Sequence, residues 1–529
     1  MYRILVSDKL GQDGLDVLDN TKDATYDMKL KMSKEELLAT IPDYDALIIR
    51  SGTQVDDDVL AAGKNLRVIG RAGIGVDNVD LRAATMRGVI VMNTPQANSI
   101  ATAEQTMTLM LAASRHTAPA HASLKAGEWA RSQFVGTQLY RKTLGVVGFG
   151  RIGRLVTARA QAFGMDVLAF DPYVSEEVGR EYGVTLVDLD DLLAQSDYIT
   201  LHTAQTPETI GMINADAINQ MKKNAVIINV ARGKLIDEAA LADALKAGRI
   251  QGAAIDVYSQ EPPPADHPLL GLDNVLHTPH LGASSFEAQR DVATQIVEQV
   301  LDALRGADYR NAINIPFQAG PEFATTRPYL DLAEKIGTLH SGLATGAIRR
   351  VEIETRGEAV EKLVKAIAAA LLKGMLSSQI ADSVNYINAP VLAEEHGITV
   401  TQTQGVATTP DYPNLITCRV KFDDRERVLA GALFAGTQPR IVRINEYHLE
   451  AKPEGVVLLL LNEDVPGVVG QIGTLLAAYN INIGEWRMGR EEPGKAALSV
   501  INLDSEPPAA LIDALERIPA IKQVKYITL

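Results

Sequence analysis

Three side chains that could carry out one reaction follow successive apolar runs in the middle of the chain: Arg232, Glu261 and His280. A histidine titrates in the range needed to accept a proton from a hydroxyl group, and a neighbouring carboxylate can orient its ring and stabilise its charged form. An arginine can bind a substrate carboxylate through two parallel hydrogen bonds and polarise the oxygen at carbon 2. Taken singly, each could be a surface or core residue. Together they predict a site that removes hydride from a 2-hydroxy acid.

A second histidine, His277, lies three residues before His280 in DNVLHTPHLGASS, so the stretch could also hold a metal pair or two core histidines. A metal pair at this spacing requires a helix to bring both rings to one face. The run is instead apolar and ends at Pro279, which predicts a strand, where residues three apart point to opposite faces. We therefore expect no metal site, a structural His277 and a catalytic base at His280.

A glycine-rich motif earlier in the chain predicts a dinucleotide site. Gly148, Gly150 and Gly153 form G-x-G-x-x-G directly after an apolar run at 143–147 and at the start of a helical segment. The first glycine permits a tight turn, the second lets the backbone approach a pyrophosphate, and the third allows the helix to pack on the strand. A glycine-rich turn of purely structural use is the alternative, but the strand, the helix and a following acidic residue are all in register.

Backbone amides and that acidic residue complete the expected cofactor site. The amides of Arg151 and Ile152 stand at the helix N-terminus, where they can bind phosphate oxygens. Asp171 ends the next strand and can accept hydrogen bonds from the adenosine ribose, and its charge repels a 2′-phosphate, so NAD is favoured over NADP. A second glycine-rich stretch, GRAGIGVDNVD at 70–80, lacks the third glycine and a suitable acid, and we expect it to be a turn that reaches the substrate.

Short apolar runs alternate with helical periodicity from residue 1 to about 315, a pattern typical of parallel α/β sheets. A long predicted helix at 99–116 separates two such series, so we expect two lobes. The carboxyl ends of parallel strands line one crevice, which would bring the three catalytic loops together. The alternation ends near Pro316, and 455–529 shows the βαββαβ order of a ferredoxin-like domain.

The chain of 529 residues has a formal charge of −15 and one cysteine, Cys418. The acidic balance argues against a nucleic-acid or membrane partner, since such surfaces need a basic footprint, and local arginines must then bind any anionic ligand. A single cysteine allows no internal disulfide and no thiolate zinc site, which fits a reducing compartment. The longest apolar runs are shorter than the ~20 residues that span a bilayer. We therefore expect a soluble, cytoplasmic protein.

Four segments, GFGRIG, NVARGKLIDEAAL, DVYSQEPP and TPHLGASS, closely resemble the D-isomer-specific 2-hydroxyacid dehydrogenases, and the resemblance runs from residue 1 to about 315. It implies catalytic roles for the arginine, glutamate and histidine named above and an NAD-binding Rossmann-type domain at 97–289. The substrate-binding domain would be flavodoxin-like and split between 1–96 and 290–315. Further cofactor contacts are expected from Thr203, Val230, Ala231, Asp256, Gly282 and Ala283.

Within that family, the length and the segments LIIRSGTQV, RVIGRAGIGVDNVD and VMNTPQANSIATAE resemble the branch that oxidises 3-phospho-D-glycerate to 3-phosphohydroxypyruvate, the first step toward L-serine. By that likeness the residues that contact the phosphate and carboxylate of the substrate would be Arg50, Ser51, Arg71 and Asn98. The planar fork of arginine suits phosphate. A dehydrogenase for another D-2-hydroxy acid such as glycerate is one alternative, and an NAD-sensing regulator without catalysis is another.

The last segment, 453–529, resembles an ACT domain, the regulatory module of several amino-acid biosynthetic enzymes, and 316–452 resembles the α+β intervening domain of longer family members. In relatives inhibited by serine this module binds L-serine between two subunits, and the matching positions here are Asn462, Asp464 and Asn482. A carboxylate for the amino group, with amides for the other polar atoms, suits an amino acid. A dimerisation module without a ligand is the alternative. From the family alone we expect a homodimer or homotetramer.

Overall fold

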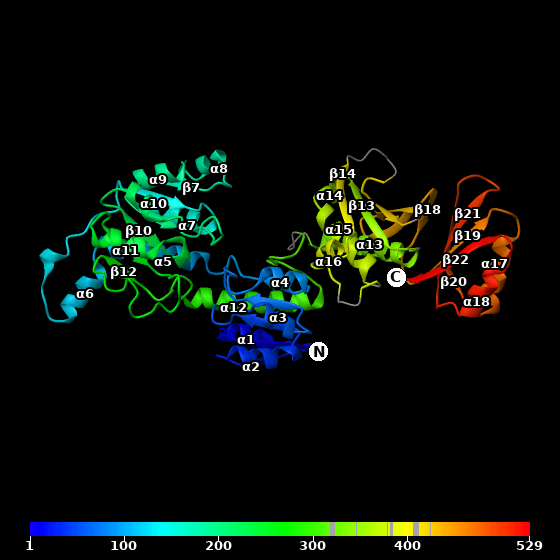
Figure 1. The fold of residues 1–529 in the computed structure, drawn as a ribbon, viewed down its shortest axis with the longest axis horizontal. Coiled ribbons are helices and arrows are strands. Elements are labelled where there is room, and N and C mark those ends of the chain that lie inside the picture. The colour runs from blue at the N-terminus through cyan, green and yellow to red at the C-terminus, as the bar shows by residue number, and fades with distance from the viewer. Residues whose placement is uncertain (318–322, 345, 378, 381–383, 406–411, 424) are drawn as a thin grey trace.

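Four β-sheets follow one another along the part of the chain that the structure describes (Figure 1). The computed structural model describes residues 1–317, 323–344, 346–377, 379–380, 384–405, 412–423 and 425–529. The first two sheets belong to α/β lobes, and the last two carry mixed or antiparallel strands.

The first lobe is a parallel sheet with the strand order β2-β1-β3-β4-β5, which is the flavodoxin-like order. Its strands are β1 (Tyr2–Val6), β2 (Ala24–Met28), β3 (Ala46–Ile49), β4 (Val68–Arg71) and β5 (Ile90–Met92). The connecting helices are α1 (Gln12–Asp19), α2 (Lys34–Thr40), α3 (Asp57–Ala62) and α4 (Leu81–Met86), with a 3-10 turn at Ile41–Asp43.

A helix from much later in the chain, α12 (Phe286–Arg305), completes this first lobe. The amide of Ala288 donates to Oγ of Ser285 (3.2 Å) at its start, and Gly306 ends it in the left-handed region at φ +67°. The helix lies so close to β4 that a Cβ at Gly70 would be 2.5 Å from Cγ2 of Val300. The first lobe is therefore built from two separate stretches of the chain.

The second lobe is a seven-stranded parallel sheet with the order β12-β11-β10-β9-β6-β7-β8. Its strands are β6 (Thr143–Val147), β7 (Asp166–Phe170), β8 (Thr185–Leu186), β9 (Tyr198–Leu201), β10 (Val226–Asn229), β11 (Gly252–Ile255) and β12 (Val275–His277). Its helices are α5 (Ser99–Ser114), α6 (Thr117–Lys125), α7 (Arg151–Ala162), α8 (Glu176–Glu181), α9 (Leu189–Gln195), α10 (Ala215–Gln220) and α11 (Glu238–Lys246), with 3-10 turns at Arg131–Gln133 and Gly233–Leu235. The strand order reverses between β6 and β9, and in open α/β sheets ligands bind at the carboxyl ends of strands at such a switch point.

The third sheet has the order β14-β13-β15-β16-β17-β18 and is mixed, with β14 parallel to β13. Its strands are β13 (Ile348–Arg356), β14 (Thr399–Gly405), β15 (Leu415–Phe422), β16 (Glu426–Phe434), β17 (Gln438–Ile444) and β18 (Tyr447–Ala451). Its helices are α13 (Phe323–Gly342), α14 (Glu358–Glu361), α15 (Val364–Leu376) and α16 (Ala389–Glu395).

The last sheet has the order β20-β21-β19-β22 and the βαββαβ succession predicted from the sequence. Its elements are β19 (Val456–Glu463), α17 (Val468–Ala478), β20 (Ile483–Arg490), β21 (Ala496–Leu503), α18 (Ala509–Glu516) and β22 (Ile521–Thr528). Alternate residues of β19 are buried on opposite faces, since Leu458 packs among residues of α17 and α18 while Leu459 joins the hydrophobic cluster of the third sheet. The third and fourth sheets therefore share a core.

These four sheets confirm the expected fold class, a Rossmann-type domain with a flavodoxin-like lobe, an α+β region and a ferredoxin-like end. In the described ranges, we find no helix with the length and apolar character that crossing a membrane would require.

Candidate active site

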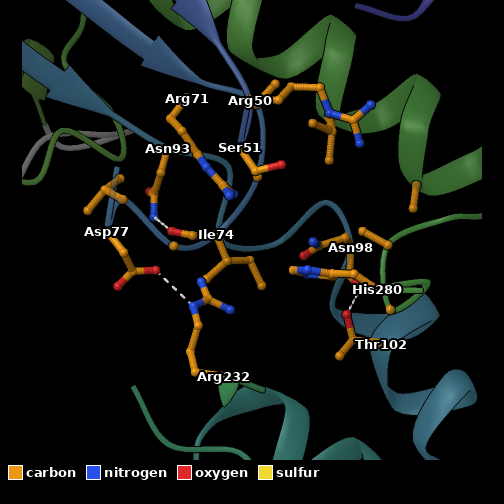
Figure 2. A pocket seen from close by; sticks show the side chains of 18 of the residues that line it. Arg50, Ser51, Arg71, Ile74, Asp77, Asn93, Asn98, Thr102, Arg232 and His280 are labelled. Atoms are coloured by element: carbon orange, nitrogen blue, oxygen red, sulfur yellow. Dashed lines mark hydrogen bonds and ion pairs between the residues drawn. The ribbon is translucent and has the colours of Figure 1, made fainter. Parts of the chain in front are cut away.

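A cavity of about 1210 Å³ is lined by residues from both α/β lobes and by α12. Figure 2 shows Arg71 and Ser51 entering it from the first lobe and Arg232 from the second, with His280 beside Asn98. The carboxyl ends of β3, β4, β9, β10 and β12 lead directly into loops that line this space. The parallel topology therefore gathers side chains that are far apart in the sequence.

His280 and Glu261 form a hydrogen-bonded pair on the cavity wall. Nδ1 of His280 lies 2.6 Å from Oε2 of Glu261, and the two side chains are 42% and 35% exposed. The second carboxylate oxygen, Oε1, accepts a hydrogen bond from the amide of Tyr258 (3.0 Å). With Nδ1 engaged by the carboxylate, Nε2 is the ring nitrogen that can exchange a proton with a ligand.

The carboxylate of Glu261 is kept ionised by its neighbours. Burial raises the pKa of Glu261, but the hydrogen bond and charge of His280, the amide of Tyr258 and the charge of Arg232 outweigh it, so the pKa lies below its ordinary value. An ionised carboxylate at Nδ1 stabilises the protonated ring that forms when Nε2 accepts a proton.

The carboxylate of Asp256 fixes the loop that carries His280. It is fully buried and accepts hydrogen bonds from Oγ1 of Thr278 (2.5 Å) and from the amides of Leu281 (2.8 Å) and Gly282 (2.9 Å). Its backbone carbonyl accepts the amide of His280 (2.8 Å). These bonds hold His280 at φ +54°, a conformation that costs a non-glycine residue about 1–3 kcal/mol. Asp256 lies behind the cavity wall, and its expected contact with the cofactor stays a prediction.

A second carboxylate, Glu238, supports the loop that carries Glu261. Glu238 accepts a hydrogen bond from the amide of Ser259 (2.8 Å) and another from the Ser259 hydroxyl. Oε2, which accepts the Ser259 hydroxyl, also lies 3.1 Å from Nε2 of His267, and the side chains of Glu238 and His267 are largely buried. A Cβ at Gly233, next to Arg232, would overlap the backbone of Tyr258, so the loops that carry Arg232 and Glu261 also pack directly against one another.

Arg232 is positioned by one contact from each lobe. Its Nε donates to Oδ2 of Asp77 (2.8 Å), and its Nη1 donates to the carbonyl of Ala231 (2.7 Å). A Cβ at Gly75 would overlap Nη2 of Arg232. The absence of a side chain at residue 75 therefore leaves the space that the guanidinium occupies.

Arg71 gives the cavity a second buried cation. Burial, together with the charges of Arg232 and Arg50, lowers the pKa of Arg71 to about 10 against the opposing effect of Asp77 and Asp8. It stays protonated at neutral pH. Its Nε is buried without a hydrogen-bond partner in the described structure. Buried polar groups are rarely left unpaired, so this group is suited to a ligand that carries negative charge.

Asn98 and Ser51 line the same cavity. Oδ1 of Asn98 is buried and has no partner among the described residues. The backbone carbonyl of Asn98 is engaged, since Oγ1 of Thr102 donates to it (3.0 Å). All four residues expected to contact the substrate therefore line the cavity.

The glycine-rich loop between β6 and α7 has the shape expected of a dinucleotide-binding turn. Gly148 has φ +94° and a hypothetical Cβ there would lie 2.7 Å from the carbonyl carbon of His202, whereas a Cβ at Gly150 would meet nothing within 4 Å. A Cβ at Gly153 would overlap the carbonyl of Gly148. Gly148 therefore makes the tight turn, Gly150 leaves room for a ligand to approach the backbone, and Gly153 allows the helix to pack closely on the strand, as the motif predicts.

Asp171, directly after β7, is joined to that loop. Its Oδ2 accepts the amide of Phe149 (2.9 Å) and its Oδ1 accepts the amide of Tyr173 (2.9 Å). Each carboxylate oxygen has a second lone pair, so the site retains capacity for ribose hydroxyls.

Comparison with known proteins assigns families to three stretches of the chain. Residues 107–282 match the model of the D-isomer specific 2-hydroxyacid dehydrogenase NAD-binding domain. Residues 325–445 match the D-3-phosphoglycerate dehydrogenase intervening domain, and 456–520 match the ACT domain. Over 530 aligned residues, covering 100% of both proteins, the chain is 43% identical to D-3-phosphoglycerate dehydrogenase of Methanocaldococcus jannaschii.

The chain belongs to the D-3-phosphoglycerate dehydrogenase family. The homologue of Archaeoglobus fulgidus is 41% identical, again over 100% of both chains. Among solved structures, the TT0316 protein of Thermus thermophilus superposes with a TM-score of 0.55 and 35% identity, covering 59% of this chain and 99% of that one. D-lactate dehydrogenase of Aquifex aeolicus, complexed with NAD and lactic acid, gives a TM-score of 0.53 and 27% identity over 57% of this chain and 96% of that one. The chain is therefore a dehydrogenase with an NAD-binding domain.

Of the residues that the sequence predicts to contact the cofactor, some line the cavity and others lie outside its lining. The expected cofactor residues on the cavity wall are Ile152, Thr203, Val230, Ala231, Gly282 and Ala283. Those that lie outside its lining are Gly148, Gly150, Arg151, Gly153, Asp171 and Asp256. The second set clusters around the β6–α7 turn, apart from Asp256, whose carbonyl accepts the amide of His280.

Sequence reasoning did not find every residue on the cavity wall. Asp77, Asn93, Lys9 and Gln289 also line it. Asp77 lies in the glycine-rich stretch that was expected to reach the substrate, and Lys9 follows the first strand, so the strand-end rule could have found both. Gln289 lies on α12, where only the tertiary fold brings it to the cavity.

His277 does not line the cavity. Its Nδ1 lies 3.1 Å from the hydroxyl of Tyr258, and the two rings stack with centroids 6.4 Å apart. Burial lowers the pKa of His277, and this effect is larger than the opposing one from the backbone near Leu269. Its contacts are those of a packed side chain beside the loop that carries His280.

The three expected effector residues do not meet within one chain. Asn462 is buried at the end of β19, and Asp464 follows it and pairs with Arg490 (3.2 Å). Asn482 precedes β20 and donates to Oδ2 of Asp504 (2.7 Å). Strand β21 lies between β19 and β20 and gives the distance between them along the sheet. Asn462 of β19 pairs with Ala497 at one end of β21, whereas the start of β20 pairs with Leu503 near the other end, about 20 Å further along the strand.

Proposed function

We propose that this protein catalyses the NAD-dependent oxidation of 3-phospho-D-glycerate to 3-phosphohydroxypyruvate, the first step of L-serine biosynthesis. The full-length similarity to proteins named D-3-phosphoglycerate dehydrogenase supports the reaction. The observation that carries the proposal is the cavity itself, whose lining brings the His280–Glu261 pair together with Arg232, Arg71 and Arg50. A phosphorylated 2-hydroxy acid has two anionic ends and one hydroxyl between them, which matches this arrangement.

Each side chain has a separate task in the proposed reaction. Nε2 of His280 accepts the proton of the substrate hydroxyl, and Glu261 stabilises the charged ring through Nδ1. Arg232 binds the substrate carboxylate and polarises the oxygen at carbon 2. Arg50, Ser51, Arg71 and Asn98 contact the phosphate and the carboxylate of the substrate, with the two arginines suited to the phosphate.

The residues around the β6–α7 turn fit NAD. The open side of Gly150 leaves room for a pyrophosphate, and the N-terminus of α7 offers the amides of Arg151 and Ile152. Asp171 is suited to the adenosine ribose and disfavours a 2′-phosphate. When bound, NAD accepts the hydride that leaves carbon 2.

The decisive experiment is an initial-rate assay of NAD reduction with 3-phospho-D-glycerate and, separately, with D-glycerate. We expect a clear preference for the phosphorylated acid, because Arg71 and Arg50 have no phosphate to bind in D-glycerate. His280→Gln should lower the rate at least a hundredfold while leaving NADH binding nearly unchanged. Preference for D-glycerate would refute the substrate assignment, and a near-normal rate for the variant would refute the base assignment.

We also propose feedback inhibition by L-serine, bound between the ACT domains of two subunits. Because Asn462 and Asp464 lie at one end of the sheet and Asn482 at the other, a site that uses all three needs residues from two chains. Adding L-serine to the assay tests this, and Asn482→Ala should abolish its effect. Inhibition that survives this substitution would place the effector elsewhere.

A homodimer or homotetramer, working in the cytoplasm, completes the proposal. The segment from α6 to Tyr140 projects from the second lobe (Figure 1), and α6 has no buried residue. Trp129 and Val135 in this segment are 83% and 78% exposed. Exposed aromatic and aliphatic side chains on an extended segment support contact with a second copy of the chain. Sedimentation at micromolar concentration would measure the subunit number, and a monomer would refute it.

A further inference from the structure

The proposed reaction leaves the position of Asp77 unexplained. This residue lies in the loop after β4, and its carboxylate is drawn beside Arg232 in Figure 2, with Oδ2 2.8 Å from Nε. Asp77 belongs to the first lobe and Arg232 to the second, so the pair joins the two walls of the cavity. In residues 1–317, all of which the structure describes, it is the one ion pair that crosses the cavity.

Asp77 already occupies Nε of Arg232, and with it the Nε–Nη2 edge of the guanidinium. An arginine binds a carboxylate with two parallel bonds along one edge of its planar fork, and each such edge includes either Nε or Nη1. Here Nε donates to Asp77 and Nη1 donates to the carbonyl of Ala231. Nη1 carries a second N–H, so its bond to the carbonyl of Ala231 can stay in place. A substrate carboxylate that binds along the Nε–Nη2 edge must therefore replace Asp77.

Of the two acceptors, only Asp77 is free to leave. The backbone around Ala231 is fixed by Asn229, which accepts the amide of Ala231 (3.0 Å) and donates to the carbonyl of Arg232 (2.9 Å). Asn229 is itself buried. The side chain of Asp77 is 44% exposed and lies on a loop, so it can turn into solvent at low cost.

We propose that Asp77 is an internal counter-ion that competes with the substrate carboxylate for Arg232. The inference rests on the proposed function, in which Arg232 binds that carboxylate. In the empty cavity Asp77 offsets part of the charge of Arg232, Arg71 and Arg50, and an incoming carboxylate displaces it. Asp77 thus lowers the affinity for the substrate. When Asp77 is displaced, the one ion pair that joins the two cavity walls is broken.

The test is calorimetric titration of the NAD complex with oxalate, a dicarboxylate that this reaction cannot oxidise. Exposed ion pairs are weak, so Asp77→Asn should tighten oxalate binding about two- to fivefold at 0.15 M salt, where charges beyond ~8 Å are screened. In the kinetic assay the KM for 3-phospho-D-glycerate should fall by a similar factor.

Asp57→Asn is the matched control. Asp57 pairs with Arg87 (2.6 Å) on the same lobe and does not line the cavity, so this variant removes the same charge without touching Arg232. Its oxalate affinity should equal that of the wild type. Unchanged binding in Asp77→Asn, weaker binding, or equal tightening in both variants would overturn the proposal. If 3-phospho-D-glycerate is not oxidised by the wild type, the proposed function fails, but the oxalate titration still tests Asp77.

Discussion

Replacing Gly75 with alanine tests whether the position of Arg232 depends on a missing side chain across the cavity. The added Cβ would overlap Nη2 of Arg232 and would lie 2.8 Å from Oδ2 of Asp77. The clash falls on the end of a flexible side chain, so the guanidinium has to turn away while the backbone stays in place. Gly75 is outside the left-handed φ region, so alanine fits its backbone conformation.

The size of the effect follows from the bond that is lost. A hydrogen bond to a charged group contributes about 1.5–3 kcal/mol, and about 1.4 kcal/mol corresponds to a factor of ten. Displacing Arg232 from the substrate carboxylate should therefore lower kcat/KM by about 10- to 150-fold. The melting temperature should stay close to that of the wild type, because no core contact is removed.

Initial rates of NAD reduction over a range of 3-phospho-D-glycerate concentrations, together with thermal unfolding, measure both quantities. Gly271→Ala is the control, since a Cβ there meets nothing within 4 Å and its φ is also outside the left-handed region. The reasoning is refuted if Gly75→Ala retains the wild-type kcat/KM, or if its melting temperature falls enough to explain the loss.

Four further predictions concern other parts of the molecule. Glu261→Gln should lower kcat about 10- to 100-fold. Because the pKa of Glu261 is lowered, the ionised carboxylate stabilises the fold above the ordinary pKa of a glutamate, and this stabilisation is lost as the pH falls through the lowered pKa; thermal scans of wild type and variant should therefore converge at acidic pH. Glu238→Gln should reduce kcat/KM about tenfold, because the loop of Glu261 loses a charged acceptor, and unchanged kinetics would show that the loop is held by other contacts. Gly150→Ala should raise the KM for NAD about tenfold with little change in melting temperature, since its Cβ projects into open space, and an unaltered KM would refute the approach of a pyrophosphate at this turn. Ile296→Ala on α12 should cost about 2–5 kcal/mol in denaturant unfolding because the side chain is fully buried, and a loss below 1 kcal/mol would contradict the packing of α12 on the first sheet.

Most of the architecture could be predicted from local patterns. Apolar runs and helical periodicity gave the two α/β series and the βαββαβ end, because strands and helices have fixed repeats of two and 3.6 residues. The glycine motif could also be interpreted from local sequence. A Cβ at Gly148 or Gly153 would overlap the backbone, whereas a Cβ at Gly150 would project into open space. Their tasks depend only on a strand, a turn and a helix that are adjacent in the sequence.

The contacts that hold the loops of His280 and Glu261 in place could not be predicted from the sequence. The expected contact of Asp256 with the cofactor stays a prediction, but the three bonds from its carboxylate to the loop of His280 were not foreseen. No spacing rule indicates that the residue after β11 will support the loop after β12, because that support depends on the register between neighbouring strands.

The sequence by itself determined the order of the elements and the glycine-rich turn after β6, since these follow from spacing along one stretch of chain. The tertiary structure alone decided that Asp77 of the first lobe meets Arg232 of the second, and that Asn462 and Asn482 lie at opposite ends of one sheet. Such contacts depend on how sheets and lobes pack, and residues 155 positions apart carry no local signal of their meeting.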